Sequence, residues 1–231
     1  MYRDKKVLAV IPARGGSKRL PKKNVRKLAG KPLLNWTIDA AIQCNCFDSI
    51  IVSTDDLEIS EIAIRAGAEV PELRPDHLAS DTATTEDLVI YILNHYDVDS
   101  DIIVILQPTS PLRKSWHIQE AIELFDSKNA YSVVSVSLCE HPPQWTNVLP
   151  SDSSLEGFIR ESDCSRSQDL QQLYRLNGAV FVYDVKQLKE RKKMKFYSDS
   201  FAYKMDSRYS IDIDSQLDFD IAEFLLVKNE N

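Results

Sequence analysis

The sequence predicts an α/β protein built on a doubly wound, mostly parallel sheet with helices on both faces. Short apolar runs alternate with amphipathic stretches up to about residue 138, a rhythm typical of repeated β-α units. The apolar runs are continuous and β-branched, as in strands that are buried on both faces. The chain has 231 residues, of which 43% are hydrophobic, so it is long enough to bury one such domain.

The predicted elements follow one another in a regular order. Strands are expected at residues 7–11, 49–53, 102–106, 132–136 and 178–183, with a last strand at 209–214. Helices are expected at 33–42, 57–66, 85–95 and 116–125, with a C-terminal helix over about 216–227. Asp55 or Asp56 would cap the second helix, and Thr84 or Thr85 the third. Ligands of such sheets bind beyond the carboxyl ends of the strands, so the loops that follow strands are the candidate sites.

The alternation of strands and helices stops at about residue 138. The segment 137–175 is rich in Ser, Asp and Gln, and Pro142 and Pro143 are adjacent in it. Such a composition favours irregular structure. We interpret residues 1–231 as one domain and about 138–170 as an insertion that projects from it as a partner-binding arm.

The bulk composition argues against several classes of protein. A net charge of −7 does not suit a general nucleic-acid binder, which needs a broad basic face. No apolar run approaches the roughly 18 residues that span a bilayer, and the first residues lead into a strand rather than a signal peptide. We therefore expect a cytoplasmic protein with no membrane partner. Cys44, Cys46, Cys139 and Cys164 lack the spacing of a zinc or redox site, which favours four reduced thiols.

A basic, glycine-containing loop follows the first predicted strand. It holds Gly15, Gly16, Ser17 and the cations Arg14, Lys18, Arg19, Lys22 and Lys23. A strand that ends in such a loop can present backbone N–H groups and positive charge to a phosphate chain. The loop has neither G-x-x-x-x-G-K-[ST] nor G-x-G-x-x-G, so a solvated charged turn is the alternative. Arg14 and Lys18 are spaced to face a polyphosphate together, and Asn24 could bind a sugar or a base.

A pair of aspartates lies near the carboxyl end, in the segment 210–215. In a strand, Asp212 and Asp214 would point to one face, while Ile211 and Ile213 would face the core. Two carboxylates beside phosphates form a natural Mg²⁺ site, because Mg²⁺ takes hard oxygen ligands and shares them with its substrate. The alternative is that Asp214 only caps the C-terminal helix.

Three further loops carry polar side chains beside predicted strands. The loop after residue 106 contains Gln107 and Thr109 between prolines that restrict its shape, although it also suits an ordinary strand-to-helix turn. The loop at 74–85 is long for a compact domain, which favours a binding function beyond helix capping. In the segment 166–178, Arg and Asn side chains suit carboxylate or hydroxyl recognition, but Asn-Gly also suits a turn.

Together these motifs resemble one enzyme family. The resemblance is carried, in order along nearly the whole chain, by IPARGGSKRLPKKN, STDD, LRPDHLASDTATTED, LQPTSPLR, RLNGAVFVYD and SIDIDSQLD. These stretches are similar to the CMP-sialic acid synthetases and, more broadly, to the acylneuraminate cytidylyltransferases. The resemblance implies a Rossmann-like nucleotidyltransferase domain and a homodimer in which the insertion helps to complete the partner's site. It also implies that CTP and a nine-carbon 2-keto sugar acid react to give the CMP-sugar and pyrophosphate, with Mg²⁺, or Mn²⁺ as a substitute.

The resemblance also implies a role for each matching side chain. For the nucleotide it implies binding by Arg14, Gly15, Gly16, Ser17, Asn24, Arg74, Ala83 and Thr85. For the sugar acid it implies contacts from Gln107, Thr109, Arg166, Arg175, Asn177, Phe181 and Phe196. For catalysis it implies Arg14, Lys18, Lys23 and Asp212, and for the metal it implies Asp212 and Asp214. The cations would stabilise the charge on the departing pyrophosphate.

Two positions depart from the family pattern. Ser167 stands where a second arginine would enter the partner's sugar pocket, so Arg166 would act from one residue away. Phe181 stands where a tyrosine is frequent. Both departures leave cytidylyl transfer intact and leave the sugar open, with legionaminic acid, pseudaminic acid and the eight-carbon acid KDO as alternatives. A non-catalytic nucleotide-binding module is the alternative of another class, and the intact aspartate pair argues against it.

Overall fold

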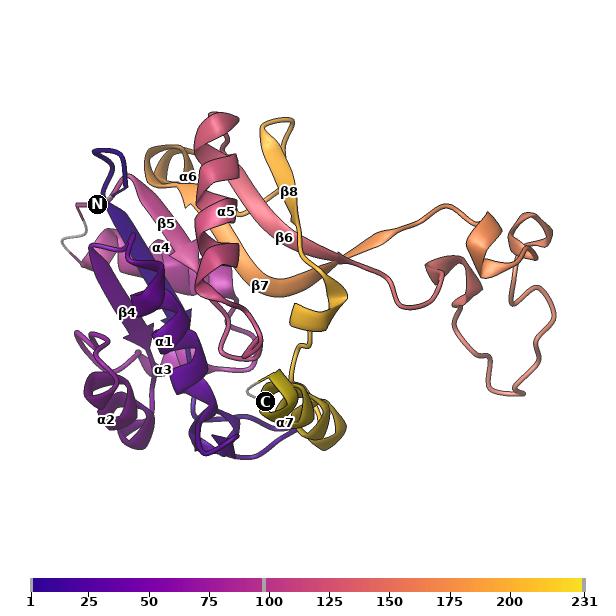
Figure 1. The fold of residues 1–231 in the computed structure, drawn as a ribbon, viewed down its shortest axis with the longest axis horizontal. Helices are drawn as coiled ribbons and strands as arrows, with labels where there is room; N and C mark the ends of the chain where they lie inside the picture. The colour runs from indigo at the N-terminus through magenta and orange to yellow at the C-terminus, as the bar shows by residue number, and fades with distance from the viewer. Residues whose placement is uncertain (1, 97–98, 230–231) are drawn as a thin grey trace.

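A computed structural model of the chain describes residues 2–96 and 99–229. Its centre is a six-stranded sheet in the order β4-β1-β5-β7-β6-β8, with helices on both faces (Figure 1). The strands are β1 (Val7–Pro12), β4 (Ser49–Ser53), β5 (Ile102–Ile105), β6 (Ser132–Leu138), β7 (Tyr174–Asp184) and β8 (Ser200–Lys204). Strand β7 runs antiparallel to both of its neighbours, whereas the other pairings in the sheet are parallel. The predicted mostly parallel α/β fold is confirmed.

The helices divide between the two faces of the sheet. They are α1 (Leu33–Cys44), α2 (Leu57–Arg65), α3 (Asp76–Ala79), α4 (Thr85–His95), α5 (Ser115–Ser127), α6 (Val185–Arg191) and α7 (Gln216–Asn229). Alternate residues of β1 separate the two cores: Val7 and Ala9 pack with α1, α2 and α5, while Leu8 and Val10 pack with α4 and α6. This alternation follows from the two-residue side-chain period of a strand. No helix among the described residues is long and apolar enough to cross a membrane.

Two predicted helix caps are confirmed. The Asp56 carboxylate accepts a hydrogen bond from the Ile59 N–H at 3.1 Å at the start of α2. Thr84 and Asp87 form a capping box at the start of α4. Each cap satisfies backbone N–H groups that have no partner within the helix. These caps fix where α2 and α4 begin, and therefore fix the loops that precede them at the carboxyl edge of the sheet.

The prediction of a strand at 209–214 is wrong. A short 3-10 helix spans Ser207–Tyr209, and residues 210–214 after it form no regular secondary structure. The Ile213 N–H donates to the Thr109 carbonyl at 2.8 Å, and Ile213 is buried with α7 and the hairpin of β2 (Lys27–Leu28) and β3 (Lys31–Pro32). Packing against this small third core holds the segment in place of a sheet ladder. The edge strand is β8, which the sequence analysis missed.

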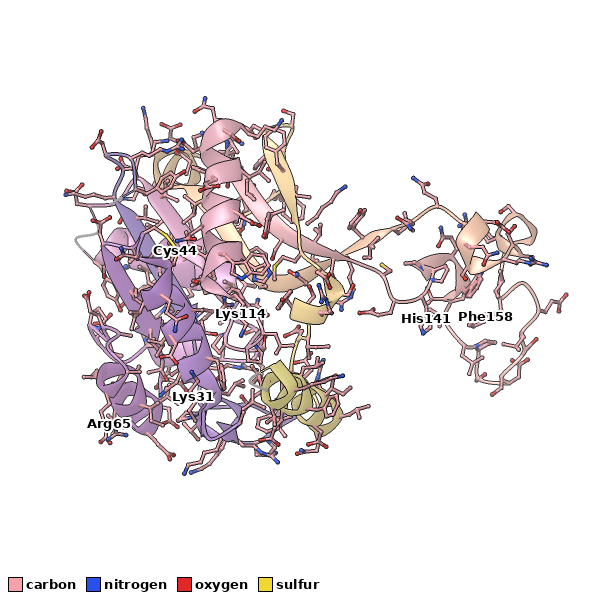
Figure 2. All side chains as sticks on the ribbon, viewed as in Figure 1. Lys31, Cys44, Arg65, Lys114, His141 and Phe158 are labelled. Atoms are coloured by element: carbon pink, nitrogen blue, oxygen red, sulfur yellow. A yellow bond between two sulfur atoms is a disulfide. The ribbon has the colours of Figure 1, made fainter. Side chains whose placement is uncertain are left out.

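The insertion projects from the body as an arm (Figure 1). It leaves at the end of β6 and returns at the start of β7, where the Cys139 N–H donates to the Leu173 carbonyl at 3.0 Å. The arm is therefore residues 139–173, close to the predicted 138–170. His141 and Phe158 lie on it, well away from Lys31 and Arg65 on the body (Figure 2). Several apolar side chains of the arm are exposed, Val148 by 85% and Leu155 by 67%.

The prediction of four reduced thiols is wrong for one pair. Cys44 and Cys46 form a disulfide, with their Cα atoms 5.5 Å apart. Asn45 lies between them in the left-handed conformation that ends α1, and this turn brings the two side chains to the same side. Cys139 and Cys164 are free. The spacing rules used for the sequence consider longer loops and miss a pairing made by a single helix-terminating residue.

Candidate active site: a charged cleft at the carboxyl edge of the sheet

Two adjoining hollows open where β1 and β5 end. The first hollow, of about 260 Å³, is lined by residues that include Arg74, Ala83, Thr85, Leu88 and Gln107. The second hollow, of about 420 Å³, is lined by residues that include Ser17, Lys18, Lys23, Asn24 and Asp214. Pro12, Arg14, Pro108 and Thr109 line both. The hollows therefore form one continuous cleft with Arg14 at its centre.

The basic loop and the carboxyl-end aspartates meet in this cleft. Arg19 contacts the Asp214 carboxylate at 2.8 Å, and Lys23 contacts it at 3.4 Å. The Lys23 ammonium also donates to the Ile213 carbonyl at 2.5 Å, and the Lys23 side chain is only 12% exposed. Residues nearly 200 positions apart thus form one charged cluster, as the interpretation of the two motifs requires.

Arg14 and Lys18 form ion pairs with a second carboxylate, that of Asp81. Asp81 contacts Lys18 at 2.5 Å and Arg14 at 3.3 Å. The hydrogen bond and charge of Lys18 hold the pKa of Asp81 below its usual value. Asp81 belongs to the loop that carries Ala83 and Thr85, so these contacts connect the walls of the first and second hollows.

Two backbone N–H groups of the basic loop already form hydrogen bonds within the protein. The Gly15 N–H donates to the Asp55 carboxylate at 2.9 Å, and the Ser17 N–H donates to the Gly15 carbonyl at 2.9 Å. A Cβ on Gly15 would lie 2.8 Å from Asp56, so this position requires glycine. The expectation that glycine-loop N–H groups face a phosphate chain is not supported at Gly15 or Ser17. The groups of this loop that face the cleft include the side-chain cations Arg14, Lys18 and Lys23.

The residues that the resemblance assigns to the nucleoside lie around the first hollow and at its border. Arg74 is buried, and its guanidinium donates to the Ser53 hydroxyl at 3.1 Å and to the Ser53 carbonyl at 2.5 Å. Burial lowers the pKa of Arg74. The Asn24 amide donates to the Arg14 carbonyl at 2.9 Å. Arg74 is thereby fixed in the wall of the first hollow, and Asn24 holds the backbone of the central arginine.

Asp212 and Asp214 lie in a segment without regular secondary structure, not in a strand. Burial raises the pKa of Asp212, and the nearby Asp214 carboxylate adds to this effect, while a hydrogen bond with Thr109 opposes it. The helix cap that was the alternative role for Asp214 is taken by Ser215, whose hydroxyl accepts a hydrogen bond from the Asp218 N–H at 3.3 Å. The Asp218 carboxylate in turn accepts the Ser215 N–H at 2.7 Å. Two oxygen-donor groups whose charges repel one another fit a hard divalent cation. Among the described residues no group of three or more His, Cys, Asp or Glu is arranged for a metal, so phosphate and water oxygens would supply the other ligands.

The residues assigned to the sugar acid are only partly brought together. Gln107 and Thr109 line the cleft, and Phe181 is half-buried in the core that includes Leu88. The Asn177 side chain is buried and bonded to the Ser135 and Ser210 hydroxyls at 2.6 and 3.0 Å. The Asn177 amide is therefore already bonded within the protein.

Three other predicted sugar-side residues lie at the margins. Arg175 pairs with Glu140 at 2.8 Å at the root of the arm and is near enough to Asp212 for their charges to interact. Phe196 is 57% exposed on the loop between α6 and β8. Arg166 lies on the arm, which projects away from the body of the chain (Figure 1). One chain alone does not bring Arg166 to the other site residues.

Two residues that adjoin the cleft lining received no role in ligand binding from the sequence. Asp55 was expected only as a possible helix cap, and Glu86 was given no role. The signal for Asp55 was its position directly after β4, the strand beside β1, because neighbouring parallel strands end at the same edge. The contacts of Glu86 lie more than 100 residues away in sequence, and no local pattern predicts them.

A continuous cleft with five cations and two carboxylates at this edge of an α/β sheet has the charge and size of a nucleotide-binding site. The sequence pattern of the family described as "Cytidylyltransferase" matches residues 8–228. The chain belongs to the cytidylyltransferase family, as its motifs indicated.

Named relatives support this assignment over most of the chain. It is 40% identical to a CMP-N,N'-diacetyllegionaminic acid synthase of Legionella pneumophila, covering 97% of this chain and 98% of the relative. It is 42% identical to an N-acylneuraminate cytidylyltransferase of Streptococcus agalactiae over 93% of this chain, but it spans about half of that relative, 52%. A solved CMP:2-keto-3-deoxy-manno-octonic acid synthetase has a TM-score of 0.71 at 16% identity, covering 97% of this chain and 99% of that one, which shows a common fold.

Proposed function

We propose that this protein transfers a cytidylyl group from CTP to a nine-carbon 2-keto sugar acid of the sialic acid type, releasing pyrophosphate. The observation that carries the proposal is the contact between the basic loop and Asp214 in one cleft. A triphosphate bound there would lie between Arg14, Lys18 and Lys23. The family assignment supports cytidine as the base.

The side chains of the cleft suit a direct displacement at phosphorus. The sugar acid's 2-hydroxyl would attack the α-phosphate while pyrophosphate leaves, a step that depends on in-line positioning and charge neutralisation. Arg14 and Lys18 would hold the triphosphate, and buried Lys23 would stabilise the negative charge that develops on the leaving group. Asp212 and Asp214 would hold Mg²⁺, or Mn²⁺ in its place, and the bound ion would polarise phosphate oxygens as a Lewis acid. Gln107 and Thr109 would orient the acid.

Legionaminic acid is the second candidate acceptor. The Legionella relative matches this chain over nearly the full length of both proteins, whereas the streptococcal relative is about twice as long. Pseudaminic acid has weaker support, because the pseudaminic acid cytidylyltransferase of Campylobacter jejuni is 32% identical.

The oligomeric state and location belong to the same proposal. We infer a homodimer in which the arm of one protomer reaches the cleft of its partner and brings Arg166 to it. The exposed apolar side chains of the arm support this, because such surfaces usually mark protein interfaces. The enzyme would act in the cytoplasm, where CTP is available.

Pyrophosphate release from CTP with N-acetylneuraminic, legionaminic, pseudaminic and KDO acids tests the activity and the acceptor together. We expect release with one nine-carbon acid far above the others, and loss of release in Asp212→Ala and Asp214→Ala proteins that still fold. Arg14→Ala should raise the KM for CTP much more than the KM for the acid. No release with any acid would favour a nucleotide-binding module, and near-normal rates of both aspartate variants in Mg²⁺ would remove the metal site.

A further inference from the structure

The loop between α6 and β8 presents aromatic side chains to solvent, and its two ends are held together by side-chain contacts. Residues 192–199 carry Phe196, 57% exposed, and Tyr197, 40% exposed. Arg191 binds both oxygens of the Asp199 carboxylate, at 3.0 and 2.6 Å. Its guanidinium also stacks 4.1 Å from the Tyr131 ring. These contacts close the base of the loop.

A second fastening connects the same loop to α4. The Glu86 carboxylate accepts the Met194 N–H at 2.5 Å and the Lys193 ammonium at 3.1 Å. The Tyr131 hydroxyl donates to the Lys193 carbonyl at 2.5 Å. Hydrogen bonds to an ionised carboxylate are stronger than those between neutral groups, and the first turn of a helix favours a negative charge. Glu86 is therefore well suited to hold the loop by its backbone.

Glu86 lies in the first turn of α4, between residues that line the cleft. Its chain neighbour Thr85 and, one turn further on, Leu88 line the first hollow. Met194 packs against the core that contains Leu88, and Phe181 packs there too. Beyond this anchor, the side chains of Lys195 and Phe196 have no hydrogen-bond or ion-pair partner in the described part of the chain. The free tip of the loop therefore starts one residue after Met194, which packs on the core that reaches the first hollow through Leu88.

We propose that Glu86 is a positioning residue for the acceptor: it fastens residues 192–199 to the cleft rim so that Phe196 forms a wall of the sugar-acid site. This inference rests on the proposed function. Glu86 touches neither substrate in this account, and its effect on the acid passes through the loop. The nucleotide side should be little affected, because Thr84 and Asp87 cap α4 independently of Glu86.

The kinetic test compares Glu86→Ala, Glu86→Gln and Glu190→Ala. Glu86→Ala should raise the KM for the sugar acid about tenfold, the effect of losing hydrogen bonds to a charged group, and leave the KM for CTP within about twofold. Glu86→Gln should recover most of the loss, because its amide oxygen still accepts the Met194 N–H. Glu190 is exposed on α6 close to the loop, so Glu190→Ala makes the same change in net charge and should match the wild type.

A double-mutant cycle with Phe196→Ala tests whether Glu86 acts through the loop. Phe196 is exposed, so its truncation should not unfold the protein. It should raise the KM for the acid by itself, and adding Glu86→Ala should then have little further effect, since coupled residues are not additive. Full additivity would overturn the proposal, as would an unchanged acid KM or a parallel rise in the CTP KM in Glu86→Ala.

The rate at which trypsin cleaves the loop tests the same contacts without measuring enzyme activity. In the wild type the fastened loop should be cut slowly after Lys192, Lys193 and Lys195, and Glu86→Ala should speed cutting there while the thermal midpoint stays close to the wild type. Equal cutting rates would overturn the fastening. If the wild type releases no pyrophosphate from CTP with any of the sugar acids, both the proposed function and the acceptor role of Glu86 are wrong. If the wild type is active and Glu86→Ala leaves the KM for the acid unchanged, only the role of Glu86 is wrong.

Discussion

Gly178 lies where β7 passes the cleft, in a backbone conformation that L side chains rarely adopt, with φ +74°. A Cβ at this position would lie 2.7 Å from the Gln107 side-chain oxygen. The absence of a side chain is therefore what allows Gln107 to lie beside the sheet at the cleft. The sequence analysis noted Asn177-Gly178 as a possible turn, and the structure places it within a strand.

We expect Gly178→Ala to reduce turnover strongly and to lower the free energy of unfolding by roughly 1–3 kcal/mol, because it strains the backbone and displaces Gln107. Steady-state kinetics and urea unfolding measure the two effects. Gly16→Ala is the control for stability, since a Cβ there meets nothing within 4 Å. Equal unfolding free energies of the Gly178 variant and the wild type would contradict the argument.

His117 predicts a pH dependence of stability. Burial, aided by the charge of Arg113, lowers the pKa of His117 from 6.5 to about 4. The unfolded state then binds more protons between these values, so the free energy of unfolding should fall as the pH falls from 6.5 to 4, by about 3 kcal/mol at most. Urea unfolding across this range measures it. His117→Gln should flatten this part of the curve, and the exposed His95→Gln should not; two identical curves for wild type and His117→Gln would exclude the effect.

At the scale of elements, the helices and buried strands follow their local patterns closely. The strand at 49–53 and the helix at 85–95 have the predicted bounds, because one face or both faces of each are apolar and capping residues mark their starts. The segment 209–214 has the same alternation as a strand and is not one. Alternation reports which side chains are buried, and here Ile213 is buried against a helix rather than in a sheet.

The arm exposes large apolar side chains that a partner could cover. Val148 and Leu149 are 85% and 55% exposed, and burial of such side chains would stabilise a dimer. We expect Val148→Asp with Leu149→Asp to shift sedimentation velocity from dimer towards monomer and to reduce turnover, because Arg166 would no longer reach a neighbouring cleft. Ser151→Asp adds charge to the same arm and should remain dimeric. A double variant that sediments as the wild type would show that these side chains do not form the interface.

For the whole molecule, charge is distributed unevenly. The chain carries a net charge of −7, yet its cleft gathers Arg14, Lys18, Arg19 and Lys23. Such a local field attracts an anionic ligand to one edge of an acidic body. Lys18 is 75% exposed and Lys23 only 12%, so salt should weaken the outer contacts far more than the inner one.

We therefore expect the KM for CTP to rise about fivefold between 50 and 500 mM KCl, while kcat changes less than about twofold, because screening acts mainly on exposed charges. Initial rates at saturating sugar acid measure both constants. Lys18→Ala should show a weaker dependence of KM on salt. A KM for CTP that is independent of salt would indicate that the exposed cations do not contact the triphosphate.

The sequence by itself determined the alternation of strands and helices, the helix caps, the projecting insertion and the family, because each depends on residues close together along the chain. The tertiary structure alone decided that β7 is antiparallel to its neighbours and that Asp81 and Asp214 pair with the basic loop. It also decided that Asp55 accepts the Gly15 N–H and that Glu86 binds a loop more than 100 residues away in sequence. Local periodicity and capping act within a few residues, whereas a binding cleft is made where distant segments are packed together.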